Sequence, residues 1–413
     1  MRKRTPEQVA ESTVSWETLE EFGKLKIQEW LQRLLEEEVT ELLGRVRHER
    51  RESVDATVGY RNGHGKPRRL SMKSGTITVR RPRMRGLEER FVSRLLPLFV
   101  RRTEEVGELL PQLYLHGLAL GDFELALRGL LGEGAPVSAS SVARLRSVWD
   151  LEYQEWTQRS LADRELVYVW ADGVYVKAGL EKEKAALLVV IGAMRDGSKE
   201  LLAVVPGYRE SKESWTAVLR DLRDRGLTAP KLFVADGNAG AWAAVATVWP
   251  ETKDQRCWNH KIVNVLDQLP RKLQGQAKEL LKEIPYAPTR AEAERRRDAF
   301  ARRYRHGYAK VAAVLEKDWE RMVTFYEFPE EHWKHLRTTN VVESPFAAVR
   351  LRTQAAKRFK KVESATAMIW KVLRVAESRF RKVNAPELMQ LVYEGVEFVD
   401  GEAVTKDSRR RAA

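Results

Sequence analysis

Three acidic residues stand at positions in the sequence where ordinary packing does not explain a charge. Asp172 follows an apolar run at residues 166–171, and Asp236 follows a second run at residues 232–235. Glu343 lies at the start of a predicted helix. An acid beside a buried strand is costly unless it is paired or binds a metal. Carboxylates are the ligands that Mg²⁺ prefers, and two such ions can assist the in-line displacement of a phosphoryl group. The three acids therefore predict metal-dependent phosphoryl transfer.

Each acid also has a purely structural explanation. Asp172–Gly173 is a hairpin-turn signal, although residues 179–183 already supply a turn nearby. Asp236–Asn238 could serve only as a strand-to-helix turn or as a helix cap. Asn340 as N-cap would place Glu343 where it completes a capping box. Capping does not exclude metal binding, so both explanations stay open.

A second constellation, Cys257-Trp258-Asn259-His260, follows the predicted sheet. The spacing of Cys257 and His260 is half of a zinc site, which His332 and His335 could complete. We expect no zinc, because the sequence has one cysteine and the two pairs lie far apart. The alternatives are a buried cysteine with a hydrogen-bonded histidine, or a Trp258 indole that stacks on an unpaired base.

Composition limits the class of protein. The 413 residues are 43% hydrophobic, and the formal net charge is +14. This length predicts two to three domains, and the charge favours a polyanionic partner without distinguishing DNA from RNA or membrane. The longest apolar run, residues 185–194, is too short to cross a bilayer, and we expect no signal peptide. A single cysteine fits a reducing cytoplasm.

The elements that must position the acids follow an α/β pattern. Three consecutive strands are predicted over residues 166–176, 185–194 and 201–208. A helix over 211–225, a strand that carries Asp236, a helix over 239–248 and a short strand near 255–258 come next. Three antiparallel strands, a helix, and then a strand beside the first is the order of the ribonuclease H-like fold. The fold class is therefore predicted as an α/β ribonuclease H-like core, a mixed five-stranded sheet with flanking helices.

A long helical stretch separates the second acid from the third. Residues 259–337 lack sheet patterning and predict an all-helical insertion. Thr289–Glu292 is a capping box at the start of an arginine-rich helix, and a second helix is predicted over 308–326. Residues 341–382 predict a return to long helix.

The region before the core is predicted to be mainly helical. Residues 16–50 have helical periodicity, as one long helix or two. Residues 61–85 hold nine Lys/Arg and no acid. The glycines and the proline at 63–67 suggest a loop. The alternating pattern of residues 76–79 suggests a strand. This segment is either a solvated basic loop or a phosphate-contacting arm. Residues 122–146 are typical of a helix-turn-helix, with an ordinary helical hairpin as the alternative.

These features divide the chain into six predicted parts. They are an N-terminal helical and basic arm region (1–100), a helix-turn-helix-like DNA-binding region (101–152), the first part of the catalytic core (153–258), the helical insertion (259–337), the final core helix with a basic segment (338–384) and a tail (385–413). The candidate DNA contacts are Arg61, Lys66, Arg68, Arg69, Arg144, Arg146, Arg350, Arg352, Lys357 and Arg358.

Four ordered motifs together resemble the Mutator-type transposases of bacterial insertion sequences. They are Ala171–Lys177, Val234–Trp242, Cys257–Lys261 with Asn264–Asp267, and Thr338–Asn340 leading through Glu343 to Thr353. The resemblance covers about residues 15–400. It implies that Asp172, Asp236 and Glu343 form a DDE active site, and that Cys257 and His260 belong to the catalytic domain.

The resemblance also implies an activity and its partners. The expected function is binding of the terminal inverted repeats of an insertion sequence, followed by metal-dependent strand cleavage and strand transfer into target DNA. Two Mg²⁺ ions per site are expected, for which Mn²⁺ can substitute, together with a homodimer or larger assembly on DNA. The expected location is the bacterial cytoplasm, in association with the nucleoid. The alternatives are a ribonuclease H-like nuclease without strand transfer and a non-catalytic DNA-binding regulator.

Overall fold

The computed structural model describes residues 16–97, 100–118, 122–131, 139–178, 185–207, 210–356 and 358–404. Its contacts divide the chain into two compact units, each described by itself below. The N-terminal unit comprises residues 1–114 and 118–145, and the C-terminal unit comprises residues 115–117 and 146–413.

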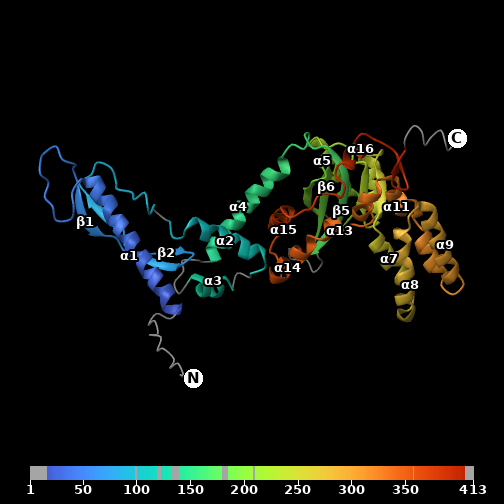
Figure 1. Ribbon diagram of the computed structural model, residues 1–413, viewed down its shortest axis with the longest axis horizontal. Helices are drawn as coiled ribbons and strands as arrows, with labels where there is room; N and C mark the ends of the chain where they lie inside the picture. The colour runs from blue at the N-terminus through green and yellow to red at the C-terminus, as the bar shows by residue number, and fades with distance from the viewer. Residues whose placement is uncertain are drawn as a thin grey trace, which may run out of the picture. The chain divides into compact units, whose positions relative to one another are not determined.

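The C-terminal unit is built on a mixed five-stranded sheet (Figure 1), as predicted. The strand order is β7-β6-β5-β8-β9. The first three strands pair antiparallel, and β8 and β9 run parallel to β5. The strands are β5 (Leu166–Val176), β6 (Ala185–Met194), β7 (Lys199–Gly207), β8 (Leu232–Ala235) and β9 (Lys253–Arg256). The last strand begins two residues before the predicted position.

Helices α5 (Lys212–Asp224) and α6 (Ala239–Val248) pack together and cover one face of this sheet. Val169 and Ala171 of β5 join Trp215 and Trp242 of these helices in one buried cluster. The predicted serine cap is confirmed, since Ser211 accepts a hydrogen bond from the backbone of Ser214 at 3.2 Å. Burial of these apolar side chains fixes α5 and α6 against the strands that carry the acids.

The opposite face of β5 is covered by residues from later in the chain. Tyr168 Oη lies 2.8 Å from His332 Nδ1, and Trp170 Nε1 donates to His335 O at 2.9 Å. Successive side chains of a strand point to opposite faces. Asp172 therefore continues the face that Tyr168 and Trp170 occupy, with Ala171 and Gly173 directed to the α5 side.

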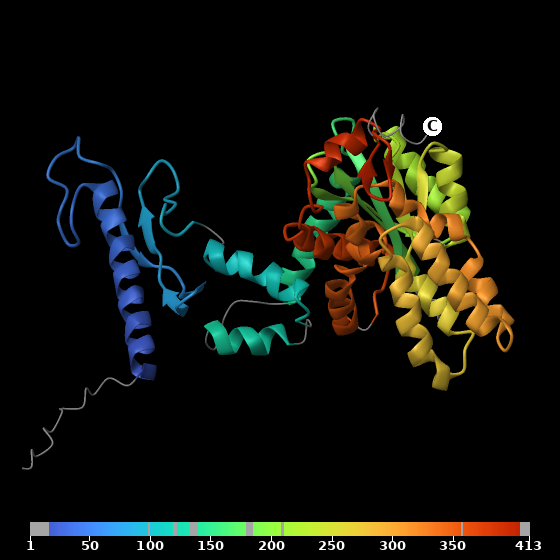
Figure 2. The same ribbon diagram turned by 45° about the vertical axis from the view of Figure 1, so that its right-hand side comes forward.

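The described residues between β9 and Thr339 form a series of helices joined by short turns, with no strand among them. The α-helices are α7 (Trp258–Leu266), α8 (Arg271–Glu283), α9 (Arg290–Arg305), α10 (Ala309–Glu316), α11 (Trp319–Val323) and α12 (Trp333–Leu336). Helices α7, α8 and α9 lie side by side (Figures 1 and 2). Thr289 accepts from the backbone of Glu292 at 3.2 Å, which confirms the predicted start of α9. The predicted helix over 308–326 is wrong, because Asp318 adopts a left-handed conformation, φ 59°, and separates α10 from α11.

The chain then forms α13 (Asn340–Glu343), α14 (Phe346–Ala356), α15 (Val362–Glu377) and α16 (Leu388–Tyr393). Two paired strands of two residues each follow, β10 (Phe398–Val399) and β11 (Glu402–Ala403). The prediction of one long helix over 341–382 is wrong. Pro345 separates α13 from α14, since proline lacks the N–H that a continuing helix needs, and a second break precedes α15.

The N-terminal unit places one helix against two antiparallel pairs of strands. Helix α1 (Trp16–Leu43) is single and ends before residue 50. The strands are β1 (Tyr60–His64), paired with β4 (Pro82–Arg85), and β2 (Arg68–Met72), paired with β3 (Gly75–Val79). Leu35 of α1 packs with Leu70, Ile77 and Val79. The predicted strand over 76–79 is confirmed, but residues 63 and 64 belong to β1, where pairing with β4 overrides the local glycine signal.

Three further helices follow, α2 (Glu104–Leu115), α3 (Phe123–Leu131) and α4 (Ala139–Gln158). The turn between α3 and α4, residues 132–138, lies outside the described residues, so the helix-turn-helix stays a prediction. None of the helices in the described ranges is long and apolar enough to cross a membrane. The boundaries between the six predicted parts also stay predictions.

Candidate active site

Asp172 and Asp236 are brought together by the parallel pairing of β5 with β8. Trp170 pairs with Val234 in that register, so continuing it by two residues sets Asp172 beside Asp236. Asp172 lies inside β5 opposite Val189 of β6. The hairpin-turn explanation of Asp172–Gly173 is therefore wrong, and this carboxylate is carried by a strand of the central sheet.

Asp236 combines a turn with its place in the site. Its Oδ1 accepts from the backbone N of Asn238 at 2.8 Å. Asn238, and not Asp236, is the N-cap of α6, and its Oδ1 accepts from Gly240 N at 2.7 Å. The turn explanation is thus correct for one oxygen of Asp236, and this bond fixes how its carboxylate is directed.

Another acid, Glu210, lies beside Asp172 and Asp236. The sequence analysis did not identify it. Carboxylate oxygens of Asp172, Glu210 and Asp236 lie within 4.8 Å of one another. Tyr175 Oη donates to Glu210 Oε1 at 2.8 Å, and Asn238 Nδ2 lies 3.5 Å from Glu210 Oε2. In the sequence, the available signal was a glutamate between the end of a strand and a serine cap, which is an ordinary surface pattern.

Glu343 lies in a second group, with Cys257 and His260. Ligand atoms of these three residues also lie within 4.8 Å of one another, and His260 Nδ1 is 3.8 Å from Glu343 Oε1. Thr339, and not Asn340, is the N-cap of α13, and its side chain makes no capping bond. The predicted capping box is wrong, because this cap position shifts by one residue.

The Thr339 hydroxyl connects Glu343 to the cysteine. It donates to Glu343 Oε1, and it also lies 3.2 Å from Cys257 Sγ. The backbone N of Thr339 donates to the same sulfur at 3.3 Å. A hydroxyl has a single proton, so it serves one acceptor at a time. Cys257 is buried, as one alternative predicted, and it anchors the turn that carries Glu343.

The two groups form one electrostatic site. Burial, together with the smaller effects of the charges of Asp236, Glu343 and Glu210, raises the pKa of Asp172 to about 7. Burial and the charge of Asp236 also raise the pKa of Glu210. Cys257, Glu343 and Asp236 raise the pKa of His260 to about 9. Charges from both groups thus act on Asp172 and on His260.

This arrangement fits a divalent cation with a preference for oxygen. Three carboxylates at close range offer the hard ligands that Mg²⁺ takes, and a cation between them would offset the repulsion that raises the pKa of Asp172. The zinc site completed by two further histidines is excluded. His332 faces Tyr168 and His335 faces Asn384 Oδ1 at 3.1 Å, so neither joins Cys257 and His260.

The stacking role suggested for Trp258 is wrong. Its side chain is 1% exposed, and Nε1 donates to Met322 O at 2.8 Å. The ring packs edge-on against Trp319, with 5.9 Å between ring centroids. Packing with α11, which the local sequence does not reveal, places this indole in the core.

The candidate DNA contacts differ in exposure. Lys66, Arg69, Arg144, Arg350 and Arg358 are exposed, and Arg61, Arg68 and Arg146 are half-buried. Arg352 is 2% exposed, which corrects its prediction as a DNA contact, because the inner face of α14 carries it into the core. Lys357 lies outside the described residues.

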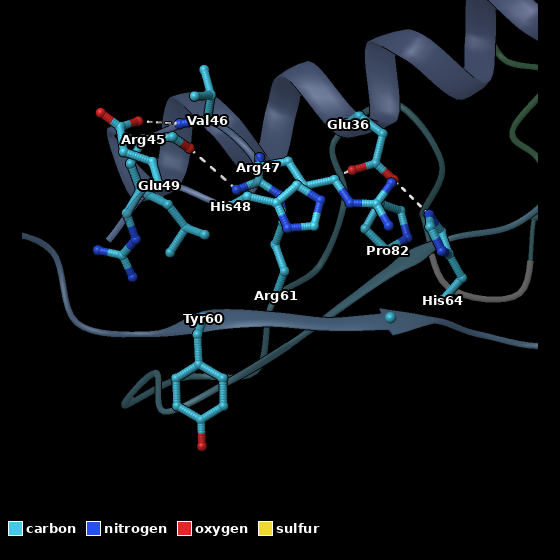
Figure 3. Close-up of a pocket in the computed structure, with 12 residues that line it drawn as sticks. Glu36, Arg45, Val46, Arg47, His48, Glu49, Tyr60, Arg61, His64 and Pro82 are labelled. Atoms are coloured by element: carbon cyan, nitrogen blue, oxygen red, sulfur yellow. Dashed lines mark hydrogen bonds and ion pairs between the residues drawn. The ribbon is translucent and has the colours of Figure 1, made fainter. Parts of the chain in front are cut away.

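Arg61 lines a basic pocket of the N-terminal unit (Figure 3). The pocket also contains Arg45, Arg47, His48 and His64. Glu36 lies between two of these side chains, with Oε1 2.6 Å from His64 Nε2 and Oε2 3.9 Å from Arg61 Nε. The predicted loop is therefore a folded basic surface whose charges are partly balanced by α1.

Comparison with known proteins identifies the class to which this fold and site belong. The model of the transposase Mutator family matches residues 4–383. The chain belongs to the Mutator family of transposases.

Individual relatives are transposases of insertion sequences. The chain is 45% identical over 296 residues to the transposase for insertion sequence element IS6120 of Mycolicibacterium smegmatis, covering 72% of this chain and 92% of the relative. It is 44% identical to the transposase for IST2 of Acidithiobacillus ferrooxidans, over 67% and 94% of the two chains. The transposase for IS256 in transposon Tn4001 of Staphylococcus aureus is 24% identical, over 88% and 92%.

Proposed function

We propose that this protein is a DDE transposase that binds the ends of an insertion sequence, cleaves DNA strands there and joins them to target DNA. The observation that carries the proposal is the pairing of Asp172 with Asp236 across β5 and β8, with Glu343 close enough to raise the pKa of Asp172. Family membership supports the same residues, since the match to the family model spans all three acids.

The core is proposed to be ribonuclease H-like, with residues 259–337 as an insertion. Strand order β7-β6-β5-β8-β9, with the first three antiparallel, supports the assignment. In such a sheet, β5 occupies the centre. The carboxylate of Asp172 on this strand faces α13, the helix that carries Glu343. The interruption by consecutive helices between β9 and α13 supports the insertion.

The acids would hold two Mg²⁺ ions, or Mn²⁺ in their place. Bound metal would activate the attacking oxygen, first of water and then of a DNA 3′-hydroxyl, and stabilise the leaving oxygen. Asp172, which belongs to the first group and is also affected by the charge of Glu343 in the second, would help to hold the metal. His260 and Thr339 orient Glu343 through the contacts described above. Phosphates of DNA would contact exposed cations such as Lys66 and Arg350.

The test is a cleavage and joining assay on DNA that carries the terminal repeats flanking this gene, with and without Mg²⁺. Glu343→Gln removes one charge without changing shape and is compared with Glu251→Gln, a change at an exposed position. We expect Glu343→Gln to slow cleavage by at least roughly a hundredfold, because losing metal-assisted charge stabilisation is worth several kcal/mol. Glu251→Gln should behave as wild type.

The outcomes distinguish the alternatives. Cleavage and joining that both require Mg²⁺ and Glu343 would support the transposase. Nicking without joined products would favour a nuclease. Tight binding of the ends with no cleavage by the wild-type protein would favour a non-catalytic regulator.

A further inference from the structure

We infer that Glu210 is a further acidic residue of the active site, where its carboxylate acts with Asp172 and Asp236 to bind a divalent cation. This inference rests on the proposed function and extends it to a residue outside the three acids of the family motif. Three observations carry it: the direction from which Glu210 reaches the site, the space that two glycines leave for it, and its hydrogen-bond partners.

Glu210 and Glu343 reach Asp172 from opposite faces of the sheet. Glu343 lies on α13, which contacts β5 and β6 and follows the residues that cover Tyr168 and Trp170. Glu210 directly precedes the cap of α5, the helix that packs on Val169 and Ala171. The Asp172 carboxylate, at the carboxyl end of the β5–β8 pairing, therefore has one glutamate on either side.

The side chain of Glu210 occupies the space above Gly173. A Cβ atom on Gly173 would lie 2.2 Å from Glu210 Oε1 and 2.7 Å from Cδ. Any larger residue at position 173 would therefore displace this carboxylate from Asp172. Gly173 directly follows the catalytic Asp172 in the chain, so the strand that carries one acid also makes room for another.

The backbone of Glu210 is held by a second close approach. A Cβ atom on Gly240 would lie 2.8 Å from Glu210 O and 2.7 Å from Lys212 N. The first turn of α6 thus packs directly on the chain before α5. Since α6 starts three residues after Asp236, this contact fixes Glu210 relative to the loop of the second acid.

The hydrogen-bond partners of Glu210 orient its carboxylate. The charge of His260 also acts on Glu210 and lowers its pKa, but by less than the charge of Asp236 raises it. Tyr175 Oη donates to Oε1, and Asn238 Nδ2 lies near Oε2. Both are neutral donors, and the pKa of Tyr175 is raised to about 12, so its hydroxyl keeps its proton near neutral pH. Ser211 already caps α5, so capping does not account for Glu210. A carboxylate held beside two others is instead suited to a cation.

The experiment measures Mn²⁺ binding to the full chain without DNA, from the electron paramagnetic resonance signal of free Mn²⁺. We expect Glu210→Gln to weaken the tightest site by about 10- to 100-fold, the range for groups that support a metal centre. Asp172→Asn should weaken it at least as much, and Glu251→Gln should leave it unchanged. Tyr175→Phe removes only an orienting donor and should have the smaller effect.

Melting curves in EDTA at pH 8 separate a metal-binding role from a structural one. Glu210→Gln removes repulsion between like charges, so we expect the metal-free variant to melt at a higher temperature than wild type while it binds Mn²⁺ more weakly. A lower melting temperature would make Glu210 a structural residue and overturn the inference. So would wild-type Mn²⁺ affinity in Glu210→Gln when Asp172→Asn has lost it. If Asp172→Asn bound Mn²⁺ as tightly as wild type, the metal site of the proposed function would instead be contradicted.

Discussion

The basic surface of the N-terminal unit and the acidic site of the C-terminal unit use charge in opposite ways. In the first, cations are placed among acceptors: Arg61 donates to Thr40 Oγ1 at 2.6 Å, and Arg68 donates to Val100 O at 2.9 Å. In the second, Asp172, Glu210 and Asp236 face one another. Mixed charges with hydrogen-bond partners stabilise their own fold, whereas gathered like charges destabilise it until a ligand binds. The acidic site is thus the region that a bound cation would stabilise.

The largest effect that tests this contrast is the pH dependence of stability without metal. The pKa of Asp172 is about 7 in the folded protein and near 4 in an unfolded chain. A raised carboxyl pKa contributes stability that is fully present below about pH 4 and is lost as the pH rises through about 7. We expect a loss on the order of a few kcal/mol in unfolding free energy between pH 4.5 and pH 8 in EDTA.

Urea unfolding followed by tryptophan fluorescence measures this loss, and Asp172→Asn is the comparison. The variant should show a smaller loss, and Mg²⁺ should reduce the loss in wild type. Equal pH profiles for the two proteins would mean that the like charges in the C-terminal unit do not destabilise it.

A smaller effect is expected from substitution at Gly240, where α6 meets the backbone of Glu210. Gly240→Ala forces a backbone shift and should lower the unfolding free energy by about 1–3 kcal/mol, with weaker Mn²⁺ binding. Gly275→Ala is the matched control. A Cβ at Gly275 meets nothing within 4 Å in helix α8, so alanine there should stabilise by about 0.5–1 kcal/mol. If Gly240→Ala were as stable as wild type, the close packing would not position the site.

The smallest effect is expected on DNA binding, from the loss of one exposed basic side chain. Lys66 is exposed in the N-terminal unit and Arg352 is buried in the C-terminal unit. Lys66→Ala should weaken DNA binding slightly and lower the slope of log K against log salt concentration by about 0.9, the value for one phosphate contact. Arg352→Ala should lower stability by about 1–3 kcal/mol instead. Fluorescence anisotropy over a salt series measures the slope, and a normal slope for Lys66→Ala would remove it as a phosphate contact.

Much of the sheet could be predicted because its signals are local. Apolar runs predicted β5, β6 and β8. Helix α5 was predicted from the serine before it and the glycine after it. The same runs drew attention to Asp172 and Asp236, since a charge next to a buried strand contrasts with its neighbours. Breaks inside helical stretches were harder to predict, because the left-handed Asp318 has no strong signal in the residues around it.

The site itself was only partly predictable. Trp258 looked like a residue near the substrate and Arg352 like a DNA contact, yet both are buried. Local sequence reports residue type and spacing, and burial depends on which distant segments pack together. The N-cap at Thr339 likewise follows from a turn anchored on Cys257, 82 residues earlier in the chain.

By itself, the sequence determined the order of the strands, the aspartate within β5 and the one that follows β8, and the family to which the chain is similar. Only the tertiary structure decided that Glu210 lies beside those aspartates and that Glu343 lies beside Cys257 and His260. The reason is physical. The position of Asp172 is fixed by its own strand, whereas Glu210 lies at a helix flank that becomes part of the site only because Gly173 and Gly240 allow two segments to approach closely.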